Sequence, residues 1–300
     1  DVGLLCNVAT LEEVAAGLTA NAEGIGLLRT ELPFLESEKW PDEAAHTKVL
    51  EPIFEALVGK LVTVRVLDFG GDKVPPFLAG LGAGTEGLPA RGLPALLGTP
   101  DALSSQLRAI LKVGRRSRLR VLLPMVTSLR EFERARFLIG EAATDVGAEV
   151  PEIGVMVEVP SAALLADTLA RRVDFFSIGS NDLTQHVLGL NRRDPTAQPA
   201  LAAHPSILTL IARVVRAGRD HGKSVAVCGE AAGDPLVLPL LVGAGVRAVS
   251  VSPARLDETR WRIRRLSRGA CEEVFSTAVR MESVDEVWDL LRERGYEEVS

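Results

Sequence analysis

Aromatic and sulfur-containing residues are scarce in this chain. Aromatic residues make up 4% of the 300 residues, and the sequence holds three cysteines, three methionines and four histidines. Cys6, Cys228 and Cys271 are an odd set without CxxC spacing, which excludes a complete disulfide framework and a cysteine zinc site. Val, Leu, Ile and Ala must therefore fill most of the core. Unpaired cysteines also predict a reducing, cytoplasmic location.

Long apolar segments and an excess of basic charge are missing as well. A membrane helix needs about 18 or more uninterrupted apolar residues, and no segment offers them. The first ten residues, DVGLLCNVAT, lack the basic region of a secretory leader. The net charge is -6 and the pI is near 5.4, whereas nucleic-acid and membrane-surface proteins favour basic faces. We therefore expect no membrane insertion and no nucleic-acid partner.

Short runs rich in Val, Ile, Leu and Phe recur along the chain, and most are followed by a segment with helical periodicity. This alternation is typical of βα units around a parallel sheet. The runs lie at residues 3–8, 24–28, 62–67, 119–124, 153–157, 175–178, 224–227 and 248–251. Eight runs favour a closed (β/α)8 TIM barrel of the α/β class, whereas an open doubly wound sheet would share the alternation but not the count.

The segments between the apolar runs predict the helices and one long loop. Helices are expected at residues 11–20, 100–113, 128–143, 161–170, 206–221, 234–242 and 253–266, with an additional C-terminal helix at 283–294. Residues 68–94 are rich in glycine and proline, so we expect a long loop there, over the mouth where barrel active sites are built. No repeat or linker interrupts the pattern, which favours one domain over residues 1–300.

Polar residues stand near or directly after the ends of several of the predicted strands. They are Arg29, Arg65, Asp68, Glu158, Asn181, Asp182, Cys228 and Glu230. One such residue alone is more often a cap or an ion pair than a ligand. Because the carboxyl ends of all strands in a parallel barrel open on one mouth, a whole set at equivalent positions predicts a functional site.

The residue types in this set predict a magnesium-bound phosphorylated acid. Glu158 and Asp182 are the sparse oxygen ligands that Mg²⁺ accepts when substrate and water complete its octahedron. Arg29 and Arg65, with Arg91 and Arg192 as further candidates, offer planar donors for phosphate or carboxylate oxygens. The nucleotide motif GxxxxGK[ST] is absent, so a nucleotide is not specifically indicated.

Cys228 is a candidate proton donor. It lies in VAVCGEAAG, with no histidine beside it to make a thiolate and with Glu230 close by to favour the neutral thiol. A thiol with a pKa of about 8.5 can protonate a strongly basic enolate carbon. A small buried apolar cysteine is the alternative interpretation, and we apply it to Cys6 and Cys271.

Six motifs together resemble a known family. They are GIGLLRTE (24–31), RVLDFGGDK (65–73), GVMVEVP (154–160), FFSIGSNDLTQ (175–185), HPSILTLI (204–211) and CGEAAGD (228–234). This set resembles the phosphoenolpyruvate (PEP)-utilising barrel of enzyme I, the PEP-protein phosphotransferase that begins the sugar phosphotransferase system. The resemblance runs from about residue 3 to the last helix.

The resemblance assigns roles to individual residues. It implies that Arg29, Arg65 and Arg192 bind PEP, with Arg193 as an alternative to Arg192, and that Asn181 contacts the phosphate. Glu158 and Asp182 become the magnesium ligands, and Cys228 becomes the donor that turns enolpyruvate into pyruvate. Arg91 aligns with a further arginine of the family, although TEGLPARGLPALL departs from the usual Asn-Pro and Leu-Gly-x-Arg pattern there.

The implied reaction moves the phosphoryl group of PEP to a histidine and releases pyruvate. In the family this histidine belongs to a swivelling N-terminal domain with a Thr/Ser-His motif, and the domain passes the group to the phosphocarrier protein HPr. None of His46, His186, His204 and His221 lies in such a motif. We therefore expect this chain to bind PEP without turnover by itself. A homodimer is expected from the resemblance only.

Three other functions compete with this one. Pyruvate phosphate dikinase and PEP synthase carry a similar barrel, and the match through the motifs LLRTE and SIGSNDLTQ favours enzyme I over them. A catalytically idle barrel that senses PEP would have no use for a proton donor such as Cys228. A pyruvate-type aldolase would share the magnesium carboxylates but would not need the arginines.

Overall fold

Eight parallel strands close into a barrel in chain order. The computed structural model describes residues 2–69, 75–79, 91–190 and 198–296. The strands are β1 (Gly3–Val8), β2 (Gly24–Leu28), β3 (Leu61–Arg65), β4 (Arg118–Leu123), β5 (Glu152–Val157), β6 (Phe175–Ile178), β7 (Ser224–Val227) and β8 (Ala248–Val251). Their order is β1 to β8 around a closed barrel, which confirms the predicted (β/α)8 fold. β3, β4 and β5 each begin one residue before their predicted range, β3 ends two residues early and β4 one residue early, and the other strands have the predicted bounds.

The contacts within the chain define two compact units, which we describe separately. One unit is Asn7–Met156, and the other joins Asp1–Cys6 to Val157–Ser300. A single domain over residues 1–300 stays a prediction. No helix among the described residues is both long enough and apolar enough to cross a membrane.

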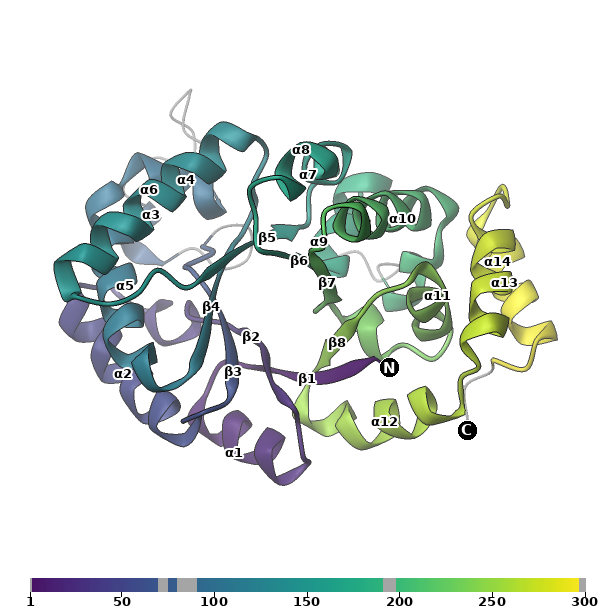
Figure 1. The fold of residues 1–300 in the computed structure, drawn as a ribbon, viewed down its shortest axis with the longest axis horizontal. Helices are drawn as coiled ribbons and strands as arrows, with labels where there is room; N and C mark the ends of the chain where they lie inside the picture. Colours follow the sequence, from purple (N-terminus) through teal and green to yellow (C-terminus); the bar gives the residue numbers. More distant parts are fainter. Residues whose placement is uncertain (1, 70–74, 80–90, 191–197, 297–300) are drawn as a thin grey trace. The chain divides into compact units, whose positions relative to one another are not determined.

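The unit Asn7–Met156 contains β2, β3, β4 and most of β5. β3 and β4 pair residue by residue, from Leu61 opposite Arg118 to Arg65 opposite Leu122. The helices are α1 (Leu11–Thr19), α2 (Glu43–Ala56), α3 (Pro76–Ala79), α4 (Gly92–Gly98), α5 (Pro100–Val113) and α6 (Leu129–Val146), with short 3₁₀ turns at Leu32–Phe34 and Gly114–Arg116. α5 packs between α2 and α6 in this unit (Figure 1). The strand interiors, such as Val62, Val64 and Val121, are fully buried because parallel strands are covered on both faces.

The unit formed by Asp1–Cys6 and Val157–Ser300 contains most of β1 together with β6, β7 and β8. β6 pairs with β7 from Phe175 opposite Ser224, and β1 pairs with β8 from Gly3 opposite Ala248. The helices are α7 (Pro160–Leu164), α8 (Ala166–Ala170), α9 (Ser180–Leu188), α10 (Pro205–Asp220), α11 (Val237–Ala244), α12 (Leu256–Arg265), α13 (Arg268–Ala278) and α14 (Val284–Glu293). Short 3₁₀ turns lie at Pro199–Ala203, Glu230–Gly233 and Pro253–Arg255.

Local sequence sets where several helices begin. The hydroxyls of Thr10, Ser128 and Ser283 each accept a hydrogen bond from the backbone amide three residues later. The glutamate at that third position reaches back to an amide just before the cap, as Glu131 does to Thr127 at 2.7 Å. These reciprocal contacts satisfy amides that have no partner inside the helix, and they explain why α1, α6 and α14 start close to their predicted positions.

Some predictions about the helices were wrong. α2 was not predicted, because Pro52 lies inside it and proline usually ends a helix. Burial of Leu50, Ile53 and Phe54 keeps the helix intact there. The segment predicted as a loop at 68–94 contains α3 and the start of α4, at least among its described residues. The segment at 161–170 forms two helices, and α9 and α13 were not predicted, so α14 is not the only helix added after α12.

Candidate functional site

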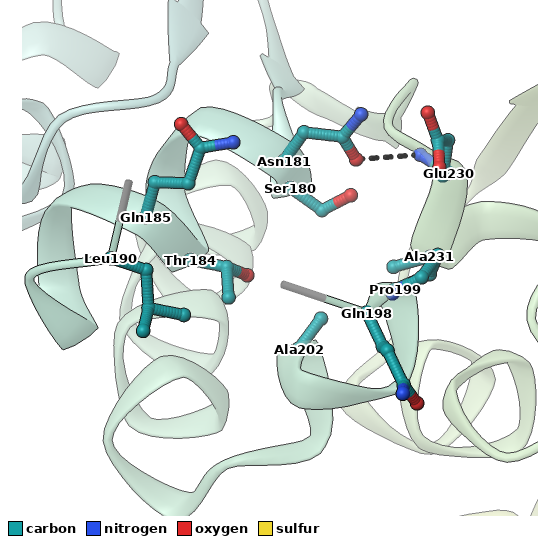
Figure 2. A pocket seen from close by; sticks show the side chains of 10 residues that line it. All are labelled: Ser180, Asn181, Thr184, Gln185, Leu190, Gln198, Pro199, Ala202, Glu230 and Ala231. Carbon is teal, nitrogen blue, oxygen red and sulfur yellow. Dashed lines mark hydrogen bonds between the residues drawn. The ribbon is translucent and has the colours of Figure 1, made fainter. Parts of the chain in front are cut away.

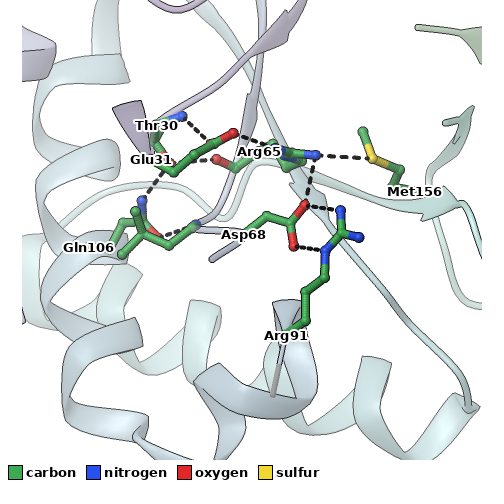
Figure 3. Close-up of polar contacts among 8 residues, drawn as sticks. Thr30, Glu31, Arg65, Asp68, Arg91, Gln106 and Met156 are labelled. Atoms are coloured by element: carbon green, nitrogen blue, oxygen red, sulfur yellow. Dashed lines mark hydrogen bonds and ion pairs between the residues drawn. The ribbon is translucent and has the colours of Figure 1, made fainter. Parts of the chain in front are cut away.

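Arg65 ends β3 and is held by carboxylates in the unit Asn7–Met156. Its guanidinium contacts Glu31 at 2.7 Å and Asp68 at 3.0 Å, and its third neighbour is the Met156 sulfur at 3.8 Å (Figure 3). Glu31 is fully buried and Arg65 is only 6% exposed. An ion pair at this depth fixes its geometry tightly, because removing one partner would strand a buried charge.

Asp68 also holds the predicted arginine Arg91. Arg91 donates from Nε and Nη2 to the two carboxylate oxygens of Asp68, at 3.2 Å each. The backbone turns sharply after it, since Gly92 has φ +62 and any Cβ there would lie 2.5 Å from the Cβ of Met125. A residue with a Cβ would not fit that position, so glycine is required there. The structure therefore brings Arg65 and Arg91 together through one carboxylate.

Arg29 is the third candidate arginine in this unit, and it makes no ion pair with a carboxylate among the described residues. It follows β2, and its backbone amide donates to Val8 at 2.9 Å. Its side-chain Nε is buried and has no hydrogen-bond partner among the residues that the structure describes. A buried donor without a partner is costly, and an anion could accept a hydrogen bond from it.

Arg65, Arg91, Glu31 and Asp68 form one cluster of charged side chains, linked by three ion pairs. Arg29 makes no ion pair with another described residue, and its buried Nε keeps a free donor there. Arginine side chains of this kind can give bidentate, charge-assisted hydrogen bonds to phosphate or carboxylate oxygens.

Two buried carboxylates characterise the other unit. Glu158 follows β5 and is 1% exposed, while Asp182 lies in the first turn of α9 and is 6% exposed. His186, one turn further along α9, contacts the backbone carbonyl of Glu158 through Nδ1 at 2.8 Å. A carbonyl can only accept, so Nδ1 carries the proton. The histidine thereby ties the helix that carries Asp182 to the strand end that carries Glu158.

These carboxylates fit a magnesium ion by their chemistry. They are hard oxygen ligands in one unit, and two carboxylates are what Mg²⁺ takes from a protein when phosphate and water supply the rest. Within the described ranges, no group of three or more His, Cys, Asp or Glu side chains could hold a metal ion. A site closed entirely by protein ligands is thus not seen there.

Asn181 presents its amide hydrogens away from its backbone partner. Its Oδ1 accepts from the backbone N–H of Glu230 at 2.9 Å (Figure 2). Because a backbone N–H can only donate, the oxygen must face it and the amide hydrogens stay available for an acceptor such as phosphate. Asn181 also borders a pocket of about 250 Å³, where the buried hydroxyls of Ser180 and Thr184 have no partner among the described residues.

Cys228 is a buried thiol at the end of β7. It is 5% exposed, and Sγ donates to the carbonyl oxygen of Ile178 at 3.6 Å. A carbonyl oxygen can only accept, so this hydrogen bond uses the protonated thiol. All three cysteines are free and buried. Burial raises the pKa of the Cys271 thiol, in keeping with an inert role.

The remaining candidates are placed as follows. Arg192 and its alternative Arg193 lie outside the described residues. His46 is fully buried against Phe34, and burial lowers its pKa to about 4. His204 caps α10, because its Nδ1 accepts a hydrogen bond from the backbone N–H of Ser206 at 3.2 Å. These contexts suit histidines with structural roles.

The sequence interpretation did not select four residues that contact the candidate site residues. They are Thr30, Glu31, Gln106 and His186. A signal existed for Gln106. It stands on the apolar stripe of its helix with Leu103, Leu107 and Ile110, and a polar residue there needs a buried partner. His186 gave no such signal, because it is exposed and its partner is a backbone carbonyl.

Solved structures similar to this chain define the fold class. A citrate lyase of Burkholderia xenovorans superposes with a TM-score of 0.57 at 15% identity, covering 98% of this chain and 91% of that one. A HpcH/HpaI aldolase/citrate lyase family protein of Burkholderia cenocepacia gives a TM-score of 0.51 at 17% identity, with 88% and 94% covered. Such low identities show the barrel fold alone.

The sequence comparisons define the family. Residues 1–268 match the family described as PEP-utilising enzyme, PEP-binding domain, and the chain belongs to this family. It is 38% identical over 296 residues to a multiphosphoryl transfer protein of Xanthomonas campestris pv. campestris, covering 98% of this chain and 35% of that protein. It is 36% identical over 299 residues to a phosphoenolpyruvate-protein phosphotransferase of Staphylococcus carnosus, with 97% and 52% covered. The chain thus spans between 35% and 52% of the length of these relatives.

Proposed function

We propose that this chain is the PEP-binding catalytic part of a PEP-protein phosphotransferase of the enzyme I type. Arg29 carries the proposal, because its buried Nε lacks a partner and its charge is not neutralised within the described residues. Family membership and two relatives named for phosphoryl transfer support this choice of substrate. Neither relative's name indicates a dikinase or a synthase.

In this proposal the residues divide the work of binding. Arg29, Arg65 and Arg91 take the anionic oxygens of PEP, Arg192 adds a further cation, and the Asn181 amide donates to the phosphate. Glu158 and Asp182 hold Mg²⁺, which neutralises charge on the phosphoryl group when bound. Phosphoryl transfer depends mainly on such positioning and charge stabilisation.

The bond changes balance with an accepting histidine and one proton from water. A histidine nitrogen attacks phosphorus, the bond from phosphorus to the enol oxygen breaks, and its electrons form the enolate of pyruvate. Cys228 then gives its proton to carbon 3, and water restores the thiol. The hydrogen bond from Cys228 to Ile178 supports this role, since it keeps the proton on sulfur.

We infer that the accepting histidine lies outside these 300 residues. His46 is buried, and neither it nor the other three histidines stands in a Thr/Ser-His motif. The phosphorylated histidine would pass its group to HPr, as the resemblance implies. The homodimer and the cytoplasmic location stay predictions.

A transfer assay tests the proposed function. The 300-residue protein receives PEP with a labelled phosphoryl group and Mg²⁺, with or without a phosphohistidine domain of the family supplied as a separate chain. We expect label on that domain together with pyruvate, and almost no pyruvate without it. Label on a histidine of this chain, or rapid pyruvate release in the absence of the domain, would contradict the proposal.

A further inference from the structure

A buried glutamine on an outer helix reaches the strand end that carries Arg65. Gln106 lies in α5, which packs between α2 and α6, and the residue is fully buried. Its Oε1 accepts from the backbone N–H of Leu67 at 2.9 Å, and its Nε2 donates to the Thr30 hydroxyl at 2.9 Å (Figure 3). One side chain thus joins the segment after β2 to the segment after β3.

The direction of every hydrogen bond in this chain of contacts is determined. The Leu67 N–H can only donate, so the glutamine oxygen faces it and the amide nitrogen faces Thr30. The Thr30 hydroxyl, having accepted from the amide, donates to the carbonyl oxygen of Arg65 at 3.0 Å. That carbonyl can only accept, so no rotation or flip preserves the set.

The contacts close around Arg65 from both backbone and side chain. Gln106 holds the amide two residues after Arg65 directly, and it holds the Arg65 carbonyl through Thr30. Glu31 binds the guanidinium at 2.7 Å with one oxygen and accepts from the Thr30 backbone amide at 3.1 Å with the other. Thr30 therefore takes part in both sets of contacts, the one that holds the Arg65 backbone and the one that holds its guanidinium through Glu31.

We propose that Gln106 is a positioning residue for PEP binding, which acts through Thr30 to fix the backbone and thereby the guanidinium of Arg65. This inference rests on the proposed function of the site. Gln106 itself is fully buried and is given no contact with substrate. A bidentate contact between an arginine and a phosphate depends on the orientation of the guanidinium. A small rotation of Arg65 therefore weakens PEP binding and phosphoryl transfer even though every substrate-binding side chain is still present.

Four substitutions separate positioning from packing. Gln106→Leu keeps the approximate volume but removes both hydrogen bonds, and Thr30→Val removes only the central hydroxyl. Thr30→Ser restores that hydroxyl on a smaller side chain. Thr259→Val is the matched control, since Thr259 is 1% exposed and lies in α12 of the other unit. Each variant is checked by thermal unfolding and by titration with PEP in the presence of Mg²⁺.

We expect Gln106→Leu and Thr30→Val to weaken PEP binding by about tenfold to a hundredfold. Thr30→Ser should bind nearly as tightly as the wild type, and so should Thr259→Val even when its melting temperature falls as far as that of Thr30→Val. If Gln106→Leu does not fold, the Thr30→Val and Thr30→Ser pair decides, because both alter the same junction and differ in the hydroxyl.

The outcomes distinguish this inference from the proposed function. Wild-type protein that shows no Mg²⁺-dependent PEP binding overturns the proposed function, and the positioning role falls with it. Wild-type binding together with unchanged binding in Thr30→Val overturns the positioning role alone. Equal weakening in Thr30→Val and Thr259→Val has the same meaning, because loss of affinity would then follow stability rather than this network.

Discussion

Arg91 donates two hydrogen bonds to Asp68, from Nε and Nη2, each 3.2 Å from one of the two carboxylate oxygens. The same carboxylate lies 3.0 Å from Arg65, so one aspartate orients two of the proposed substrate arginines. This arrangement places Arg91 in the cluster despite the unusual sequence around it.

The two arginines should differ in importance. Arg65→Ala leaves the buried carboxylates of Glu31 and Asp68 without their shared cation, and breaking a buried pair costs about 3–5 kcal/mol. Arg91→Ala leaves Asp68 still paired with Arg65, so we expect a smaller loss of stability and of PEP affinity. Urea unfolding and calorimetric titration compare the two variants. Equal losses in both measurements would show that Arg91 is as central as Arg65.

Removal of the thiol should separate binding from protonation. We expect Cys228→Ala to bind PEP as the wild type does, yet to form pyruvate about 10²- to 10⁴-fold more slowly when the phosphohistidine domain is supplied. Cys271→Ala is the control, because that cysteine is fully buried in α13 and has no proposed part in the reaction. A pyruvate assay measures both. Undiminished pyruvate formation by Cys228→Ala would reduce the cysteine to a packing residue.

His186 should tune the proposed magnesium site through the backbone of Glu158. His186→Leu removes the donor to that carbonyl, whereas His186→Asn places an amide nitrogen in a similar position. Loss of a group that orients a metal ligand typically costs about 10- to 100-fold in affinity. We expect that loss in the Mg²⁺ dependence of PEP binding for the leucine variant and a smaller one for the asparagine variant. Identical Mg²⁺ dependence in both would exclude the role.

His46 should make stability depend on pH. Burial lowers its folded-state pKa to about 4, with Asp42 opposing the shift, so the unfolded chain binds the extra proton between that value and the ordinary 6.5. The free energy of unfolding is therefore highest above about pH 6.5, where the histidine is neutral in both states. It falls by about 3 kcal/mol in total as the pH decreases toward about 4. We expect the free energy of unfolding, measured with urea, to fall less between pH 7.5 and pH 5 for His46→Leu than for the wild type. Parallel curves for the two proteins would refute this assignment.

The sequence predicted the barrel because strands buried on both faces leave uninterrupted apolar runs, and those runs also located the polar residues after them. It did not predict the contacts that orient these residues. Glu31 and Arg65 are 34 residues apart, and Gln106 lies 39 residues from Leu67, so only the folded chain brings each pair together. α2 was not predicted because its stability also depends on the folded chain. Burial of Ile53 and Phe54 outweighs the local effect of Pro52.

The carboxylates should control the metal dependence of binding. Glu158→Gln and Asp182→Asn keep side-chain size but remove the charges that the proposal assigns to Mg²⁺. We expect each to abolish the difference in PEP affinity between solutions with Mg²⁺ and with a chelator, because few other oxygen ligands are proposed. A calorimetric titration in both solutions measures this. A variant whose affinity still responds to Mg²⁺ as the wild type does would remove that carboxylate from the site.

Calorimetric titration of PEP into the wild type and Arg29→Ala, both with Mg²⁺, tests the central claim most directly. Arg29 has no carboxylate partner among the described residues, so its removal should leave thermal stability nearly unchanged. We expect saturable binding to the wild type and at least about a tenfold loss of affinity in Arg29→Ala, as for a lost charge-assisted hydrogen bond. Absence of saturable binding to the folded wild type, or equal affinity in the two proteins, would contradict it.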